Sequence, residues 1–92
     1  MRLNKVTTKK GTLEFKHVGP AYDFDSAAEA FDILLDGRKI LTLLLDCADA
    51  EVGLYSFYAY DSKRQDAQDA EFLGDTKKSA MAKLKALVDL VF

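Results

Sequence analysis

Residues Ile40 to Asp46 read ILTLLLD and carry apolar side chains on both faces of any strand that they form. A strand with one face in water alternates apolar and polar residues, because successive side chains point to opposite faces. A run that is apolar on both faces needs a central position covered on both sides, or a second copy of the chain that covers one side. This run therefore predicts a sheet with Ile40–Asp46 as an interior strand.

The segment before this strand, residues 25–37 (DSAAEAFDILLDG), supports two interpretations. As a helix, Ser26 and Glu29 would form a capping box. As a strand, its apolar residues alternate up to Asp36-Gly37, a strong signal for a two-residue hairpin, and Arg38–Asp46 returns as the partner. We favour the hairpin and keep the helix as the alternative.

Further strands are expected towards both ends of the chain. Arg2–Thr8 and Thr12–Val18 flank a Lys-Lys-Gly turn and predict an N-terminal hairpin, which Gly19-Pro20 should end because proline lacks an amide donor. A tight acidic turn is expected at Cys47–Glu51, followed by a strand at Val52–Asp61. The polar segment Ser62–Glu71 predicts a mobile loop, and Phe72-Leu73 a short edge strand.

The last segment, residues 74–92 (GDTKKSAMAKLKALVDLVF), has the spacing of an amphipathic helix. Asp75 or Thr76 can accept a hydrogen bond from the free amides of the first turn. The expected buried stripe consists of Ala80, Leu84, Leu87, Val88 and Val91, with Met81 beside it and Lys78, Lys85 and Asp89 opposite. The whole pattern predicts one α+β domain over residues 1–92, with an antiparallel sheet of four to five strands (an N-terminal hairpin plus a central meander) packed by one C-terminal amphipathic helix.

Composition limits the class of protein. A chain of 92 residues that is 49% hydrophobic and 30% charged is typical of one folded domain. The longest uncharged stretch, Val52–Tyr60, is far shorter than the roughly 20 apolar residues of a membrane helix, and Met1–Lys5 does not lead into the apolar core of a secretory signal. A lone cysteine, Cys47, forms no internal disulfide. We expect a cytoplasmic protein with no membrane partner.

No catalytic residue, cofactor or metal site is predicted. His17 and Cys47 are the only residues of their kinds, whereas metal sites need three or four converging ligands. We expect His17 at the surface and Cys47 as a small apolar filler, with a Cys–His nucleophile as the alternative. The cluster of Asp46, Asp49 and Glu51 lacks the ligand number and the glycine of a calcium loop, so solvated turn acids are expected there. These observations disfavour an enzyme.

Charge is unevenly distributed along the chain. Residues 1–16 hold five bases and one acid (+4), residues 17–75 hold thirteen acids and four bases (−9), and residues 76–92 hold four bases and one acid (+3). If the acids of the middle segment share one surface, that surface attracts cationic partners and repels nucleic acid.

Aromatic residues add contact area to this acidic segment. The strand Val52–Asp61 places Tyr55 on one face and Tyr58 and Tyr60 on the other. An aromatic face left uncovered usually marks an interface, and the alternative is that the N-terminal hairpin covers it. We predict a non-catalytic protein–protein interaction module that binds a basic protein surface, with a homodimer and a phage-type inhibitor of a nucleic-acid-processing enzyme, comparable to anti-CRISPR proteins, as possible forms. The predicted partner-binding residues are Asp46, Asp49, Glu51, Tyr55, Tyr58, Tyr60, Asp66 and Asp69.

The start of the C-terminal helix supports an alternative function. A run of strands followed by Gly74, Lys77, Lys78 and Ala80 is similar to the end of double-stranded-RNA-binding domains, in which lysines at a helix start contact phosphates. The GDTKKSA stretch also resembles the sheet-to-helix junction of HicB-like antitoxin domains. The resemblance covers residues 74–92, and Met81 stands where a further basic residue would be expected. It implies an RNA-binding domain whose anion-binding residues are Lys9, Lys10, Lys77 and Lys78, although the acidic middle segment makes nucleic acid the less favoured partner.

Overall fold

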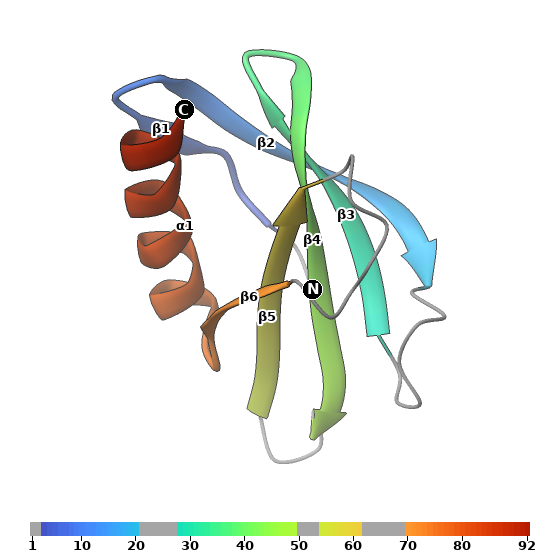
Figure 1. Cartoon of the computed structure of the whole chain (residues 1–92). Helices are drawn as coiled ribbons and strands as arrows, with labels where there is room; N and C mark the ends of the chain where they lie inside the picture. Colours follow the sequence, from blue (N-terminus) through green and yellow to red (C-terminus); the bar gives the residue numbers. More distant parts are fainter. Residues whose placement is uncertain (1–2, 21–27, 50–53, 62–69) are drawn as a thin grey trace.

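Six antiparallel strands follow one another in chain order across one sheet, and a C-terminal helix lies along the open side of that sheet (Figure 1). The computed structural model describes residues 3–20, 28–49, 54–61 and 70–92. The elements are β1 (Val6–Thr8), β2 (Gly11–Pro20), β3 (Ala28–Leu35), β4 (Arg38–Asp49), β5 (Leu54–Asp61), β6 (Glu71–Gly74) and α1 (Lys77–Val91). This confirms the α+β class and the C-terminal helix, but the sheet has six strands and not four or five.

The central strand β4 lies between β3 and β5, as its apolar sequence predicts. Ile33 pairs with Leu41 and Leu34 with Lys39, so Ile40 is an extra residue, and both Ile40 and Leu41 join the core. Every residue in the middle of β4 is buried: Ile40, Leu41, Thr42, Leu43, Leu44 and Leu45. Because this burial occurs within one chain, the strand needs no second copy to cover it.

The hairpin interpretation of residues 28–37 is confirmed, and the helical one is wrong for these residues. Asp36 has φ +49° and Gly37 has φ +87°, the pair of positive values that a type I′ turn requires. Side chains at alternate positions of β3 enter the core, including Phe31 and Ile33. Pairing with strands on both sides outweighs a capping box at the start of the segment. Residues 25–27 lie outside the described residues.

Several predicted boundaries are wrong. Strand β1 begins at Val6, so residues 3–5 do not belong to it. Strand β2 does not end before Gly19-Pro20, because both residues pair with β3 after a bulge at His17/Gly19, and proline is tolerated as the last residue of the strand. Strand β4 continues to Asp49, so Cys47–Asp49 are not in a tight turn. Glu71 begins β6 and does not belong to a loop.

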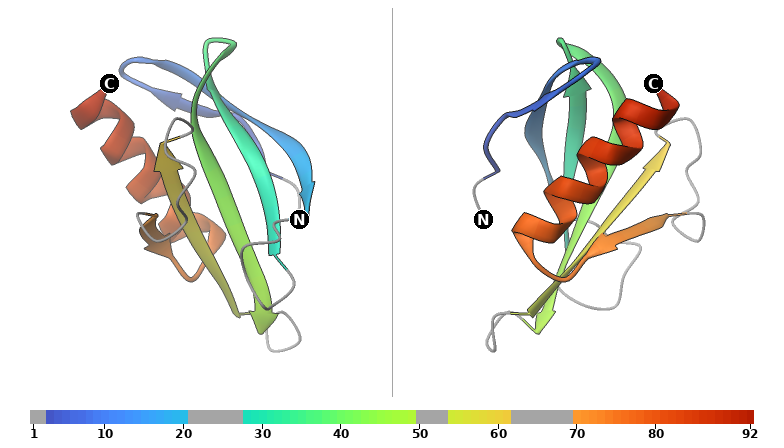
Figure 2. Two further views of the ribbon diagram at one scale, coloured as in Figure 1. Left: turned by 45° about the vertical axis from the view of Figure 1, so that its right-hand side comes forward. Right: turned by 90° about the vertical axis from the view of Figure 1, so that its left-hand side faces the viewer.

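The sheet curls into a half-barrel, and α1 crosses its open side (Figure 2). A register shift interrupts each pairing from β2–β3 to β5–β6, and such bulges bend strands and increase their twist. The helix buries Ala80, Leu84 and Val88 at intervals of four residues against the concave face.

Polar contacts attach α1 to the sheet on both flanks. Towards β1, the Asp89 carboxylate accepts a hydrogen bond of 2.8 Å from the Lys9 amide. Towards β6, the Lys83 ammonium donates a bond of 2.7 Å to the Phe72 carbonyl. Thr76 caps the first turn through a hydrogen bond of 3.1 Å from the Ser79 amide. These contacts fix the helix across the gap between the first and last strands.

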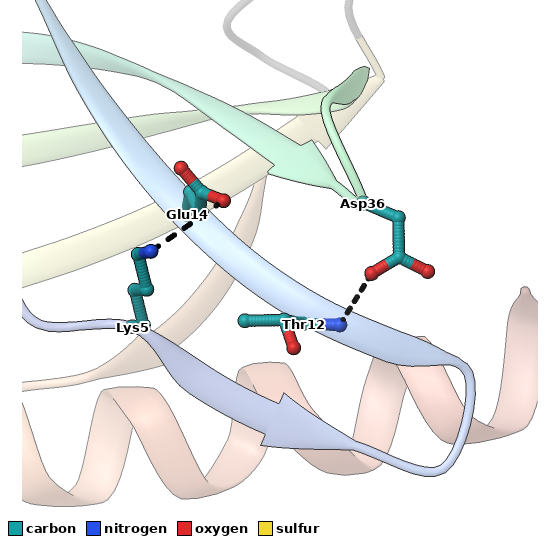
Figure 3. A network of polar contacts seen from close by, with 4 residues as sticks. All are labelled: Lys5, Thr12, Glu14 and Asp36. Atoms are coloured by element: carbon teal, nitrogen blue, oxygen red, sulfur yellow. Dashed lines mark hydrogen bonds and ion pairs between the residues drawn. The ribbon is translucent and has the colours of Figure 1, made fainter.

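Two hairpin turns meet near the C-terminal end of α1 (Figure 3). The Asp36 carboxylate accepts a bond of 2.9 Å from the Thr12 amide, and the Asp36 amide donates one of 3.0 Å to the Thr12 carbonyl. Gly11 has φ +141°, and a Cβ at this position would overlap the Asp36 carboxylate. Beside this contact, Lys5 and Glu14 form an ion pair of 3.9 Å.

We expect Gly11→Ala to destabilise the fold more than Gly19→Ala. Both glycines have φ near +140° (+141° and +145°), so both substitutions carry the same backbone strain of about 1–3 kcal/mol. Only Gly11→Ala also displaces the Asp36 carboxylate from the Thr12 amide, a loss of about 1 kcal/mol. Urea denaturation measures both free energies of unfolding, and equal losses would contradict the proposed contact.

We expect Leu84→Ala to reduce the free energy of unfolding by about 2–5 kcal/mol, because Leu84 is fully buried between α1 and the sheet. Lys85→Ala, next to it on the exposed side of α1, serves as the control and should change stability by less than about 0.5 kcal/mol. Thermal and urea unfolding followed by circular dichroism measure both. A loss below about 1 kcal/mol for Leu84→Ala would mean that α1 is not part of the core.

Candidate functional site

The sheet face that points away from α1, here the outer face, carries a strip of three aromatic residues. This aromatic strip consists of Tyr58, Tyr60 and Phe72. Tyr58 pairs with Phe72 across β5 and β6, and their ring centroids lie 5.5 Å apart. Phe72 is 47% exposed on the edge strand β6, while both tyrosines are half-buried. The strip therefore presents an aromatic pair to solvent at the edge of the sheet.

The alternation of β5 separates the predicted tyrosines. Phe57 and Ala59 are buried in the core beneath α1, and Tyr55 packs beside them with its ring 6.4 Å from that of Phe57. Tyr58 and Tyr60 point to the outer face. The structure therefore places Tyr55 on the face opposite Tyr58 and Tyr60, as strand alternation predicts.

The N-terminal hairpin does not cover the aromatic strip. Strand β2 pairs with β3 edge to edge, so the hairpin extends the sheet and does not fold over it. On its far side β1 faces α1 (Figure 2). This arrangement favours an outer face that is available for contact around Phe72.

Of the predicted partner-binding acids, only Asp46 has a described side chain. It lies half-buried in β4, opposite Ala28 and Ser56, on the same face as Tyr58. Asp49 lies in β4, but its side chain, together with Glu51, Asp66 and Asp69, lies outside the described residues. The structure therefore places Asp46, Tyr58 and Tyr60 on one face of the sheet.

Several of the described acids contact other groups of the chain. Asp36 and Asp89 accept hydrogen bonds from backbone amides, and other acids lie beside cationic side chains of several elements. The lysine–carboxylate pairs are Lys5–Glu14 (3.9 Å), Lys39–Asp32 (3.0 Å) and Lys83–Glu71 (3.9 Å), and the His17 imidazole lies 3.5 Å from the Glu29 carboxylate. Surface pairs of this kind contribute at most about 1 kcal/mol each to stability. Among these pairs, only Lys83–Glu71 brings a cation from outside residues 17–75, because Lys39 is already counted in the sum of −9 and Glu14 lies outside that segment.

His17 lies at the rim of the sheet, as predicted. Its side chain is 53% exposed and contacts Glu29, and its ring meets that of Phe31 edge-on at 5.1 Å. The side chain of Cys47 lies outside the described residues, so the nucleophile alternative stays untested. Among the described residues, no group of three or more histidine, cysteine or carboxylate side chains is arranged to hold a metal ion.

Of the four lysines of the anion-binding alternative, Lys9 and Lys10 lie near the C-terminal end of α1, and Lys77 and Lys78 lie at its start. The Lys9 amide contacts Asp89 near the C-terminal end of the helix, and Lys10 follows it in the same turn. Lys77 and Lys78 form the first turn, twelve residues from Asp89. At 1.5 Å per residue this separation is roughly 18 Å, so the two pairs do not form one basic patch.

A groove that sequence reasoning missed lies between the last turns of α1 and the end of β5. This end groove has a volume of about 220 Å³ and is lined by Leu41, Ala59, Tyr60, Asp61, Glu71, Leu87, Val91 and Phe92. Beside it, Leu90 is 85% exposed and Val91 63% exposed. The apolar run Leu90–Phe92 could have indicated an apolar surface here, because three consecutive residues of a helix cannot all lie on its buried face.

Comparisons with models of protein families, with curated protein sequences and with solved structures gave no match for this chain. Within the described ranges, no helix combines the length and the apolar character needed to cross a bilayer.

We expect no retardation of duplex RNA in a gel-shift assay at low salt. Phosphate binding needs several cations that converge on one backbone, and the two lysine pairs are roughly 18 Å apart along α1. The control is the variant with Lys9, Lys10, Lys77 and Lys78 all changed to glutamine, which should behave like the wild type. Retardation by the wild type that this variant loses would restore the RNA-binding alternative.

Proposed function

We propose that this protein is a non-catalytic protein–protein interaction module that makes its contact through the aromatic strip. The observation that carries the proposal is the Tyr58–Phe72 pair, with centroids 5.5 Å apart and Phe72 47% exposed on the face that α1 leaves uncovered. Aromatic residues with a supported orientation are frequent binding hot spots.

Covering the exposed part of Phe72 would contribute to the free energy of binding. Full burial of a phenylalanine side chain stabilises by about 1.5–3 kcal/mol, so covering its exposed half on a partner contributes about 1 kcal/mol. Tyr58 holds the ring from the neighbouring strand, which reduces the side-chain entropy lost on binding. A partner with an apolar pocket would therefore gain affinity from this pair without a rearrangement of the sheet.

Charge around the strip favours a basic rim on the partner. Asp46 lies on the same face, and Asp61 and Glu71 lie at the ends of the two strands that carry the strip. Lys83 contacts Glu71 at 3.9 Å, so the carboxylates are partly neutralised. Such charges set the association rate and the orientation of a partner more than its affinity.

Two narrower functions are not part of the proposal. RNA binding needs the two lysine pairs on one face, and they lie at opposite ends of α1. Inhibition by blocking the nucleic-acid groove of an enzyme would need a continuous acidic surface, and several of the described acids contact cations.

Site-specific photo-cross-linking tests the proposal. A photoreactive residue at position 72 should capture a protein in cells from which the sequence derives, and the same residue at position 82, on the exposed side of α1, should not. Equal capture at both positions would contradict the aromatic strip as the contact surface.

We expect Phe72→Asp to weaken binding of the captured partner, once purified, by about tenfold or more, because a carboxylate would replace the ring in a desolvated contact. Ala82→Asp adds the same charge at an exposed position of α1 and should bind like the wild type. Isothermal titration calorimetry measures both, with circular dichroism as the check on folding. Unchanged affinity of the Phe72→Asp variant would refute the proposal.

A further inference from the structure

The end groove combines a buried apolar floor with two carboxylates. Leu41 and Ala59 are 6% and 3% exposed, whereas Asp61 and Glu71 are exposed at neighbouring ends of β5 and β6. We infer that this groove receives one arginine side chain of the protein that contacts the aromatic strip. The inference rests on the proposed function and adds to it a second contact of different chemistry.

Strand register directs both carboxylates towards α1. Leu41 pairs with Asp61 across β4 and β5. Ala59 pairs with Glu71 across β5 and β6. Paired residues project to the same face of a sheet, here the concave face, because Leu41 and Ala59 belong to the core. Contact between Lys83 of α1 and Glu71 agrees with this direction. The apolar floor and the two carboxylates can therefore contact the same side chain.

This mixed lining fits a cationic side chain with an apolar stem. Arginine and lysine lay such a stem along apolar surface, and their charged head groups donate strong hydrogen bonds to carboxylates. A purely apolar occupant would remove Asp61 and Glu71 from water without a compensating hydrogen bond, which is unfavourable. The same carboxylates would repel an anionic occupant. Charge complementarity therefore selects a cation.

Aromatic residues in the lining favour arginine over lysine. Tyr60 and Phe92 both line the groove, and a guanidinium group stacks on aromatic rings and is more weakly hydrated than an ammonium group. The groove volume of about 220 Å³ is below the roughly 300–1,000 Å³ typical of sites for small-molecule ligands, as expected for a site that holds one side chain.

Lys83 does not saturate the Glu71 carboxylate. The two groups lie 3.9 Å apart, which is longer than a hydrogen bond. The Lys83 ammonium donates instead to the Phe72 carbonyl at 2.7 Å. A carboxylate accepts up to about four hydrogen bonds, so contacts within the chain leave capacity for a guanidinium group.

The groove adjoins the aromatic strip at Tyr60, which belongs to both. Phe72 of the strip follows Glu71 of the groove directly on β6. A partner that covers the Phe72 ring is thus close enough to place an arginine side chain in the groove. This continuity favours the partner of the strip as the source of the arginine.

Titration of the isotope-labelled protein with short peptides, followed by NMR, tests the chemistry of the groove. The probes are acetyl-Gly-Arg-Gly-amide, its lysine counterpart and its citrulline counterpart, which keeps the shape of arginine without the charge. The arginine peptide should bind in the millimolar range and shift the amide signals of Asp61, Glu71 and Leu87. The citrulline peptide should bind at least about tenfold more weakly and the lysine peptide about threefold more weakly. No shifts at these residues, or equal binding of either counterpart, would overturn the inference.

Asp61→Asn combined with Glu71→Gln removes both charges and keeps the shape of both side chains. This double variant should bind the arginine peptide at least about tenfold more weakly than the wild type. Asp75→Asn changes an exposed carboxylate that does not line the groove and should match the wild type. Circular dichroism checks the folding of both. Unchanged affinity of the double variant would also overturn the inference.

Calorimetry with the purified partner separates this inference from the proposed function. Phe72→Asp and the double variant should each weaken binding of that partner. If only Phe72→Asp weakens it, the aromatic strip stands as the contact and the arginine in the groove is refuted. If cross-linking at position 72 captures no protein, the proposed function fails, and the partner inferred for the groove fails with it.

Discussion

Burial of one face of α1 against the curled sheet is the interaction on which the rest of this structure depends. The half-barrel has a concave apolar face and two edge strands, β1 and β6, that do not pair with each other. The helix covers that face with Leu84 and its neighbours and is bonded near both edges, through Asp89 to the Lys9 amide and through Lys83 to the Phe72 carbonyl. It thereby takes the place of the strands that would otherwise close the sheet.

The position of α1 also decides which surfaces are left for binding. Because the helix occupies the concave side, the outer face keeps the aromatic strip, with Phe72 the most exposed of its residues. Because the last turn of the helix carries apolar residues beyond its buried stripe, Leu90 projects beside the end groove. Both surfaces thus arise from one packing arrangement, and they adjoin at Tyr60, which belongs to the aromatic strip and also lines the end groove.

The net charge of a sequence segment does not by itself predict the charge of a surface of the folded protein. The middle segment has a net charge of −9, yet two of its acids contact groups from outside the segment: Asp36 accepts a hydrogen bond from the Thr12 amide, and Glu71 lies 3.9 Å from Lys83. Asp32 lies 3.0 Å from Lys39 because the β3–β4 hairpin places them on neighbouring strands, and Glu71 reaches Lys83 only because β6 lies beside α1. Strand register and packing decide these pairs, so a surface potential cannot be added up along the sequence.

Local chemistry in the sequence determined the elements themselves: the turn at Asp36-Gly37, the alternation of β5, the helical stripe and the cap at Thr76. Each depends on residues a few positions apart. Only the tertiary structure decided that the sheet has six strands, that Tyr55 faces the core, that the lysine pairs lie at opposite ends of α1, and that a groove forms beside Leu90. These features depend on contacts between residues that are distant in the sequence. A local sequence pattern does not predict the free energies of such contacts.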